Sequence, residues 1–210
     1  IWCMNFACSG ADTDEGILEP QLMHSWPLES DVAAPRVQPQ VDQVEARLRT
    51  RGYEQLNIAM ISGGGNDVGF GDVVVGYLIL PGEFRLSDTA AQNLISDIDA
   101  LVPVAYRNLK DEFDRRFDYD RVLVSEYPDP LRGKNGDFCD MGFGNPPSEF
   151  SALKDAFLQR LNDTIRTTVD GFPDWRYVGG TMAASRRHGI CNEERRYFNR
   201  DLVESFAVQG

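Results

Sequence analysis

The sequence has 210 residues, of which 42% are hydrophobic and 26% are charged, a composition that is typical of one globular domain. Because 33 acidic residues outweigh 21 basic ones, the net charge is −12 and the isoelectric point is about 4.6, which disfavours binding to nucleic acids or anionic membrane surfaces. The longest apolar run, residues 73–80, contains Gly76 and ends at Pro81, so no segment approaches the roughly 18 to 20 residues needed to span a bilayer.

The N-terminal part of the chain combines a long loop with a first helix and strand. Prolines interrupt residues 1–40 repeatedly, so we expect an irregular excursion over the surface there. Apolar residues at helical spacing between Val41 and Leu48, followed by Gly52, predict a short amphipathic helix. The apolar run 56–62 predicts a buried strand, and the glycines after it predict a tight turn into another helix.

A helix with one apolar stripe is predicted over residues 94–102. Ser87 or Asp88 can cap it, and its apolar residues recur at the spacing of a single helix face. Pro103 follows the stripe, and we expect it to kink or divide the helix because proline has no N–H to donate.

Two more strands and a helix complete the pattern. Residues 121–126 and 175–178 are predicted strands, and a helix capped by Ser148, with Phe157 on its apolar stripe, lies between them. Continuous apolar strands separated by helices are typical of a parallel sheet covered on both faces. The sequence therefore predicts a three-layer α/β/α sandwich that forms a single domain over residues 1–210.

The cysteines and the acidic residues give no metal site. Cys3, Cys8, Cys139 and Cys191 allow three disulfide pairings, and four buried thiols remain an alternative. They form no C-x-x-C pair and have no histidine set beside them, which argues against zinc. The acidic run 12–15 lacks the ligand spacing of an EF-hand, so we expect a solvated loop and neither a metal nor another cofactor.

The segment Ile61–Phe70, with the sequence ISGGGNDVGF, contains the strongest candidate site. It lies where a predicted strand ends, and ligands of parallel sheets bind at the carboxyl ends of strands. Val68 replaces the third glycine of a dinucleotide-binding turn, and no Gly-Lys-Ser/Thr follows, so neither nucleotide motif fits. Asn66 can offer an amide donor to an oxyanion, and the alternative is that Asn66 or Asp67 caps the next helix.

Candidates for a nucleophile and a base are few. Ser9 lies in the small-residue segment ACSGA and lacks a G-x-S-x-G context, so we do not expect it to be a nucleophile. The histidines are His24 and His188. Two arginines precede His188 and oppose formation of its imidazolium, which favours a structural role for this residue over a catalytic one.

Four short segments occur in a characteristic order: ACSGA at 7–11, GGNDVGF at 64–70, SEYPDP at 125–130 and HGIC at 188–191. Together they resemble the SGNH hydrolases, also called the GDSL lipase/esterase family, and in particular the secreted bacterial branch. The resemblance extends from about residue 3 to the end of the chain. It implies a flavodoxin-like parallel sheet and ester hydrolysis through an acyl-enzyme.

The resemblance also implies roles for individual residues. The family holds its oxyanion with three donors, which are the N–H of the nucleophilic serine, a glycine N–H and an asparagine side chain. By motif match, the glycine is Gly10 and the asparagine is Asn66, which agrees with the amide donor inferred from the turn itself. No metal or other cofactor is implied.

Two family segments are missing from the sequence. It contains no Gly-Asp-Ser, where the family has its nucleophile, and no late His-Pro-Asn, where it has its base. We therefore expect the serine to precede Ile1 and the histidine to follow Gly210, with the chain an internal fragment that does not hydrolyse esters alone. In family members with a similar HGIC segment the histidine is structural, and His188 stays open as an alternative base.

The secreted branch tends to contain disulfides. This implies a bridge between Cys139 and Cys191 and a location outside the cytoplasm, whereas Cys8 can pair with Cys3 or with a cysteine outside the chain.

Three hypotheses on function follow. In the first, the chain is part of a serine esterase or lipase whose partner is a small-molecule or lipid ester. In the second, the scaffold has lost catalysis and binds glycan, lipid or protein. In the third, the serine arrives on a separate polypeptide. A Gly-Asp-Ser upstream and a histidine downstream would favour the first.

Overall fold

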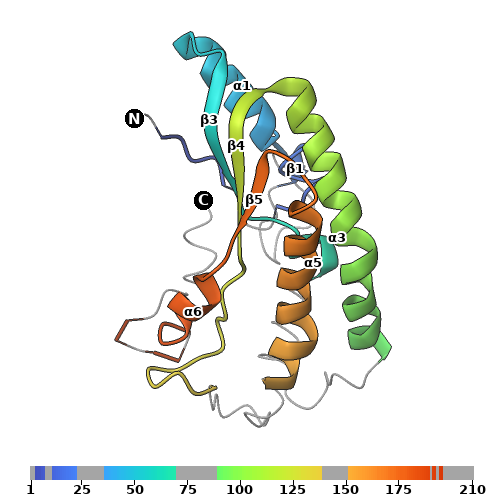
Figure 1. The fold of residues 1–210 in the computed structure, drawn as a ribbon, viewed down its shortest axis with the longest axis vertical. Coiled ribbons are helices and arrows are strands. Elements are labelled where there is room, and N and C mark those ends of the chain that lie inside the picture. The colour runs from blue at the N-terminus through green and yellow to red at the C-terminus, as the bar shows by residue number, and fades with distance from the viewer. Residues whose placement is uncertain are drawn as a thin grey trace, which may run out of the picture.

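A computed structural model of the chain describes residues 3–7, 11–22, 36–69, 89–138, 151–189, 191–192 and 194–195. The helices and strands are β1 (Gln21–Leu22), β2 (Arg36–Val37), α1 (Gln40–Arg51), β3 (Gln55–Ile61), η1 (Asn66–Val68), α3 (Thr89–Arg116), β4 (Asp118–Ser125), η2 (Lys154–Gln159), α5 (Arg160–Val169), β5 (Trp175–Val178) and α6 (Thr181–Ser185). Strands thus alternate with helices along the chain (Figure 1), and the predicted α/β class is confirmed.

The strands β3, β4 and β5 form one parallel sheet in that order. Ile61 pairs with Val124, and Ser125 pairs with Val178, so the three strands end together at one edge. The segments that leave this edge are the glycine turn after β3, the Tyr-Pro segment after β4 and the start of α6 after β5. This is the edge where the sequence predicts the candidate site.

Helix α1 forms where the sequence predicts it and ends at the predicted glycine. Gly52 has a φ of 70°, a left-handed conformation that favours glycine, and its N–H donates to carbonyls of the last turn. At the other end, the N–H groups of Gln40 and Val41 donate to the carbonyls of Gly16 and Ile17 at 2.9 and 3.2 Å. The loop before α1 therefore supplies acceptors that a helix N-terminus lacks.

The loop expected over residues 1–40 is more regular than predicted. Its described parts contain the antiparallel pair of β1 and β2, each of two residues, which the sequence analysis missed. Strands this short carry no alternation that periodicity can detect.

Pro103 was expected to kink or divide helix α3, and the prediction of a division is wrong. The helix runs unbroken through Pro103 for 28 residues. A buried stripe continues on both sides of the proline, and its members are Ile98, Val102, Tyr106, Leu109 and Phe113. Burial of this stripe outweighs the roughly 3 kcal/mol that a proline costs inside a helix.

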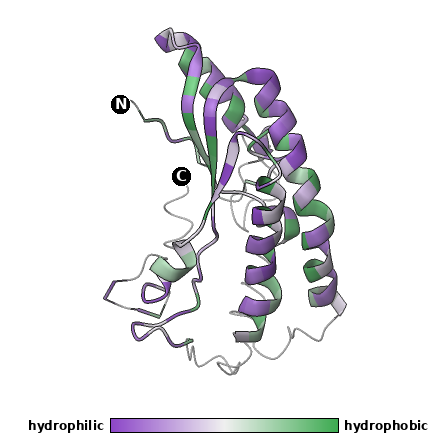
Figure 2. Cartoon of the chain, viewed as in Figure 1, coloured by the Kyte–Doolittle hydropathy of each residue, from purple (hydrophilic) through white to green (hydrophobic). Residues whose placement is uncertain are grey.

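The core lies between the sheet and the helices α3 and α5. Val122 and Val124 of β4 and Trp175 of β5 are fully buried there, and the α5 residues Leu161 and Ile165 confirm the predicted stripe of that helix. Figure 2 shows hydrophilic and hydrophobic residues alternating around both helices, as expected when one side faces a sheet and the other faces water. No helix among the described residues has the length and apolar character needed to cross a bilayer.

The prediction that the strand at residues 56–62 is buried is wrong for one face of β3. Ile58 and Met60 are 59% and 79% exposed, whereas Ala59 and Ile61, which point to the other face, pack against the core. Val178 of β5 is also 42% exposed. A continuous apolar run does not reveal whether one face or both faces of a strand are covered, and the described residues cover the face toward α3 and α5.

Candidate active site

Three consecutive glycines form the turn that follows β3. Gly64 has a φ of 97°, which a side chain would disfavour. The carbonyl of Gly63 accepts a hydrogen bond from the Tyr106 hydroxyl at 2.9 Å, and the N–H of Gly65 donates to the Tyr127 hydroxyl at 2.8 Å. Tyr106 of α3 and Tyr127, which follows β4, thus each fix one of the two glycines that flank Gly64.

Asn66 follows this turn and lies exposed at the carboxyl edge of the sheet. Its side-chain Nδ2 donates to the carbonyl oxygen of Ala11 at 2.8 Å. A primary amide carries two N–H donors, so one anchors Asn66 and the second can serve a ligand. Because Ala11 directly follows Gly10 in the chain, this bond brings Asn66 to the segment that carries the other predicted oxyanion donor.

Neither Asn66 nor Asp67 caps the short helix η1, and the longer helix predicted after the glycine turn, up to residue 80, lies outside the described residues, so the capping alternative for that helix stays a prediction. The residue at the N-cap of η1 is Gly65, and no side chain caps this short helix. The Asp67 carboxylate instead accepts hydrogen bonds from the backbone N–H of Thr13 at 3.2 Å and from the Thr13 hydroxyl. Both polar side chains therefore join the glycine turn to the loop at residues 11–13.

The acidic run 12–15 predicted a solvated loop, but this loop is partly buried. Thr13 is only 1% exposed, and burial raises the pKa of the Asp12 carboxyl, with the charges of Asp67 and Glu15 adding to the effect. The Asp12 carboxylate accepts a hydrogen bond from the backbone N–H of Glu15, which shapes the turn. Within the described residues, no three His, Cys, Asp or Glu side chains converge in a way that could hold a metal ion.

Tyr127 is itself held by Asn162, a buried residue of α5. The Asn162 Oδ1 accepts the Tyr127 N–H at 2.8 Å, and its Nδ2 donates to the Tyr127 carbonyl at 3.1 Å. Burial raises the pKa of Tyr127 to about 12 and also raises the pKa of Tyr106 well above its ordinary value, so both hydroxyls are neutral at physiological pH. In the sequence, Tyr127 stands out only as part of the SEYPDP segment, and these contacts were not predicted.

Several predicted residues lie outside the described part of the chain. They are Gly10, Ser9, His24, Cys8 and Cys139. Cys3 is a free, exposed cysteine, so the alternative bridge between Cys3 and Cys8 is wrong. Cys191 is disulfide-bonded, and its pairing with Cys139 stays a prediction.

His188 lies after α6, on the segment that carries the HGIC sequence. Its Nδ1 is 2.6 Å from the carbonyl oxygen of Arg195, a contact within its own segment. Beside it, a Cβ on Gly189 would lie 2.3 Å from the carbonyl oxygen of Arg132, so only glycine allows this close approach. The contacts of Gly189 give this segment a packing role against the loop after β4, whereas the structural role predicted for His188 and the alternative that it is a base both stay predictions.

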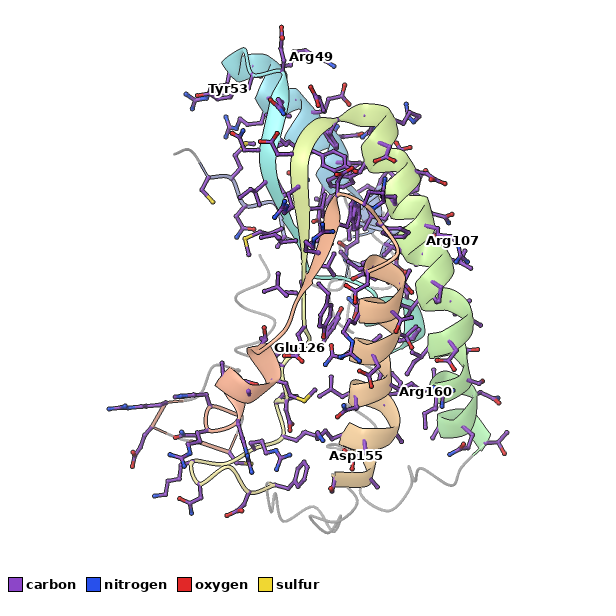
Figure 3. All side chains as sticks on the ribbon, in the orientation of Figure 1. Arg49, Tyr53, Arg107, Glu126, Asp155 and Arg160 are labelled. Carbon is purple, nitrogen blue, oxygen red and sulfur yellow. The ribbon has the colours of Figure 1, made fainter. Side chains whose placement is uncertain are left out.

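The loop after β4 and the start of α6 are also tied together. Glu126, labelled beside the start of α6 in Figure 3, accepts hydrogen bonds from the N–H groups of Gly180 and Met182 at 2.8 Å each. Asp129 is buried and pairs with Arg132 at 2.7 Å. The segments that leave β4 and β5 thus form one connected unit at the carboxyl edge.

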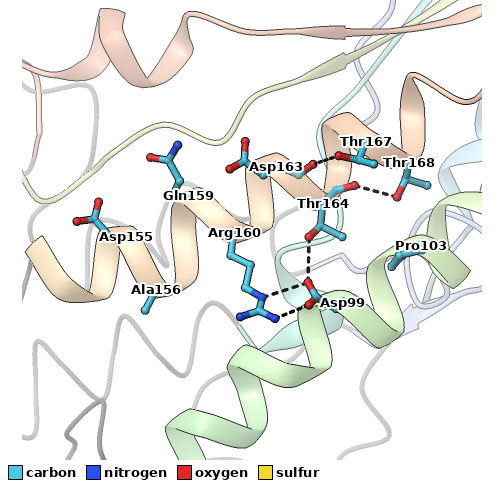
Figure 4. A pocket seen from close by; sticks show the side chains of 10 residues that line it. All are labelled: Asp99, Pro103, Asp155, Ala156, Gln159, Arg160, Asp163, Thr164, Thr167 and Thr168. Carbon is cyan, nitrogen blue, oxygen red and sulfur yellow. Dashed lines mark hydrogen bonds and ion pairs between the residues drawn. The ribbon is translucent and has the colours of Figure 1, made fainter.

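A separate hollow lies between α3 and α5, lined by Asp99, Arg160, Thr164 and neighbouring residues (Figure 4). Arg160 forms a two-pronged ion pair with Asp99 and holds the pKa of that carboxyl below its ordinary value. The hollow is on the helices and not at the carboxyl ends of the strands. Its other carboxylates, Asp155 and Asp163, form ion pairs with Lys154 and Arg166, so the hollow carries no separate candidate site.

Substitution of Gly65 by alanine tests the contact between the glycine turn and Tyr127. A Cβ at Gly65 would lie 2.8 Å from the Tyr127 hydroxyl oxygen and 2.9 Å from ring carbons, although the backbone at Gly65 suits any residue. We expect a free energy of unfolding about 1–3 kcal/mol lower than that of the unmodified protein, measured by urea denaturation. The matched control is Gly179→Ala, whose Cβ would meet only the Tyr177 ring at 3.6 Å; equal losses in both variants would contradict the tight packing.

The fold and the site together define an α/β chain whose strongest candidate site is a side-chain amide at the carboxyl end of a parallel strand. Solved structures with this fold include an extracellular lipase from Streptomyces rimosus, with a TM-score of 0.51 and 22% identity over 77% of this chain and 65% of that one. They also include a phospholipase A1 from Streptomyces albidoflavus NA297, with a TM-score of 0.51 and 20% identity over 74% of this chain and 66% of that one. The chain thus spans about two thirds of the length of these structures, and it matches no protein-family model and no curated protein.

Proposed function

We propose that the chain is part of a serine ester hydrolase of the SGNH type, acting on carboxylic esters. The observation that carries this proposal is the position of Asn66: its amide is exposed at the carboxyl edge of the sheet and anchored to Ala11, the residue after Gly10. This bond supports the proposal because Ala11 belongs to the same short segment, ACSGA, as the other predicted donor. Fixed donors of this kind stabilise the oxyanion of acyl transfer.

In the proposed reaction, a serine outside the 210 residues attacks the ester carbonyl carbon, and a histidine outside them takes the serine proton. The carbonyl oxygen becomes an oxyanion that accepts hydrogen bonds from the Gly10 N–H and the second N–H of the Asn66 amide. Collapse of the tetrahedral intermediate expels the alcohol, which receives the proton from the histidine. Water then cleaves the acyl-enzyme by the same route in reverse.

The structural neighbours support the substrate class and the location. One is described as a lipase and the other as a phospholipase A1, which supports a lipid ester as substrate. The first is also described as extracellular, and the disulfide at Cys191 fits an oxidising compartment, which supports a location outside the cytoplasm.

Fluorophosphonate labelling of the full-length polypeptide that carries this chain tests the proposal. A nucleophilic serine attacks phosphorus, fluoride leaves, and the serine oxygen keeps a stable phosphonyl group. We expect one adduct, on a serine that peptide mass mapping places outside the 210 residues, and no adduct after heat denaturation. Absence of an adduct on the folded protein would favour the scaffold that binds without catalysis, and an adduct on Ser9 would overturn the proposed position of the nucleophile.

A further inference from the structure

We propose that Tyr127 is a positioning residue for Asn66, because its hydroxyl fixes the glycine turn that presents the Asn66 amide. This inference rests on the proposed function, in which Asn66 is an oxyanion donor. It concerns a residue in the segment that follows β4, 62 positions from the N–H that it binds.

The need for such a residue follows from the turn itself. Glycine has more backbone freedom than any other residue, and three in succession precede Asn66. A donor held by a loose turn would sample many orientations, whereas oxyanion stabilisation requires a donor that is fixed before the reaction. Something outside the turn must therefore restrict it.

Two tyrosine hydroxyls supply this restriction, and we name them together the tyrosine clamp. Tyr106 donates to the carbonyl of Gly63 and Tyr127 accepts from the N–H of Gly65, so the clamp holds the residue on each side of Gly64. The Tyr127 bond is the closer of the two to Asn66, because Gly65 is the residue directly before it. The Tyr127 ring also packs where a Cβ of residue 65 would lie, so it contacts the turn closely.

Tyr127 can act as a fixed point because its own backbone is anchored. Both hydrogen-bonding groups of its main chain are bound by the Asn162 side chain, which is only 4% exposed in the core of α5. Hydrogen bonds therefore link α5 to Tyr127, and Tyr127 to Gly65, the residue directly before Asn66. Without the hydroxyl, the buried Gly65 N–H loses its acceptor, and the turn is less restricted directly before Asn66.

The test is a double-mutant cycle in the full-length polypeptide, with turnover of p-nitrophenyl butyrate as the assay. We expect Tyr127→Phe to lower kcat by about 10- to 100-fold with KM changed less than about twofold, since a misplaced donor weakens the transition state and not ground-state binding. In the Asn66→Ala background, the same substitution should have no further effect on kcat. Tyr119→Phe is the matched control, because this hydroxyl bonds to Asp114 and Trp175 near the start of β4, away from the site; it should leave kcat unchanged.

Different outcomes separate the possible failures. An equal loss from Tyr127→Phe with and without Asn66, or an unchanged kcat, would overturn the positioning role while leaving the proposed function intact. Absence of both turnover and fluorophosphonate adduct in the unmodified protein would overturn the proposed function and, with it, the role of Tyr127 in catalysis. If Tyr127→Phe does not fold, Tyr106→Phe takes its place in the cycle, and the same two results for that variant support or overturn the clamp.

Discussion

Replacement of Asn66 by alanine is expected to lower kcat for ester hydrolysis by about 100- to 1000-fold in the full-length polypeptide, the typical loss when one oxyanion donor is removed. The reason is that one N–H of its exposed amide is bound to Ala11, which leaves the other as the proposed oxyanion donor. The measurement is steady-state turnover of a chromogenic ester, together with the midpoint of thermal unfolding. The thermal midpoint should change little, because Asn66 is exposed and makes few contacts.

The matched control for this substitution is Asn57→Ala. Asn57 is another exposed asparagine and lies in β3, toward the amino end of the strand. Its Nδ2 donates to Asp120 at 3.0 Å. It should leave kcat unchanged. Similar turnover in the Asn66 variant and the unmodified protein would remove Asn66 from the oxyanion hole.

Replacement of Trp175 by alanine is expected to have the largest effect on stability, a loss of about 3–5 kcal/mol in the free energy of unfolding. Trp175 is fully buried, and its ring makes edge contacts with the rings of Tyr106, Phe113 and Phe172 at centroid distances of 6.5, 5.8 and 5.6 Å. Its Nε1 also donates to the Tyr119 hydroxyl at 3.1 Å. Removal leaves a cavity where β5 meets α3.

Urea denaturation of the Trp175 variant measures this loss. Val178→Ala, three residues along β5 on the exposed face, is the control and should change the free energy of unfolding by no more than about 0.5 kcal/mol. A loss below 1 kcal/mol for Trp175→Ala would contradict the central position of this ring. Since Tyr106 also holds the glycine turn, the same variant should weaken the site as well as the core.

Local patterns in the sequence predicted the elements well and their contacts poorly. The stripe of α5 and the end of α1 at Gly52 were both visible, because each depends on residues a few positions apart. The continuation of α3 through Pro103 depends instead on burial against the sheet, which a single helix pattern does not contain. The exposed face of β3 was not predicted for a related reason, because an apolar run has the same pattern whether one face or both faces of the strand are covered.

The contacts that build the site were beyond prediction for a different reason. Thr13 meets Asp67 across 54 positions, and Gly65 meets Tyr127 across 62. The second separation is set by the register of a parallel sheet, in which β3 pairs with β4 after a long crossover, and the first depends on the fold of the N-terminal loop against the glycine turn. The family resemblance supplied the donor roles, but it gave no information on the tyrosines that hold the turn.

The parallel register has a consequence for how the chain reaches this structure. Each pairing in the parallel sheet joins residues more than fifty positions apart, as between Ile61 and Val124 or between Val124 and Tyr177. The contact order of this sheet is therefore high. Loop closure of this kind is slow, whereas α3 depends on contacts four residues apart and can form early. The bonds of Asn66 and Tyr127 also join segments 55 and 62 positions apart, so we expect the site to take shape late in folding, after the sheet has paired.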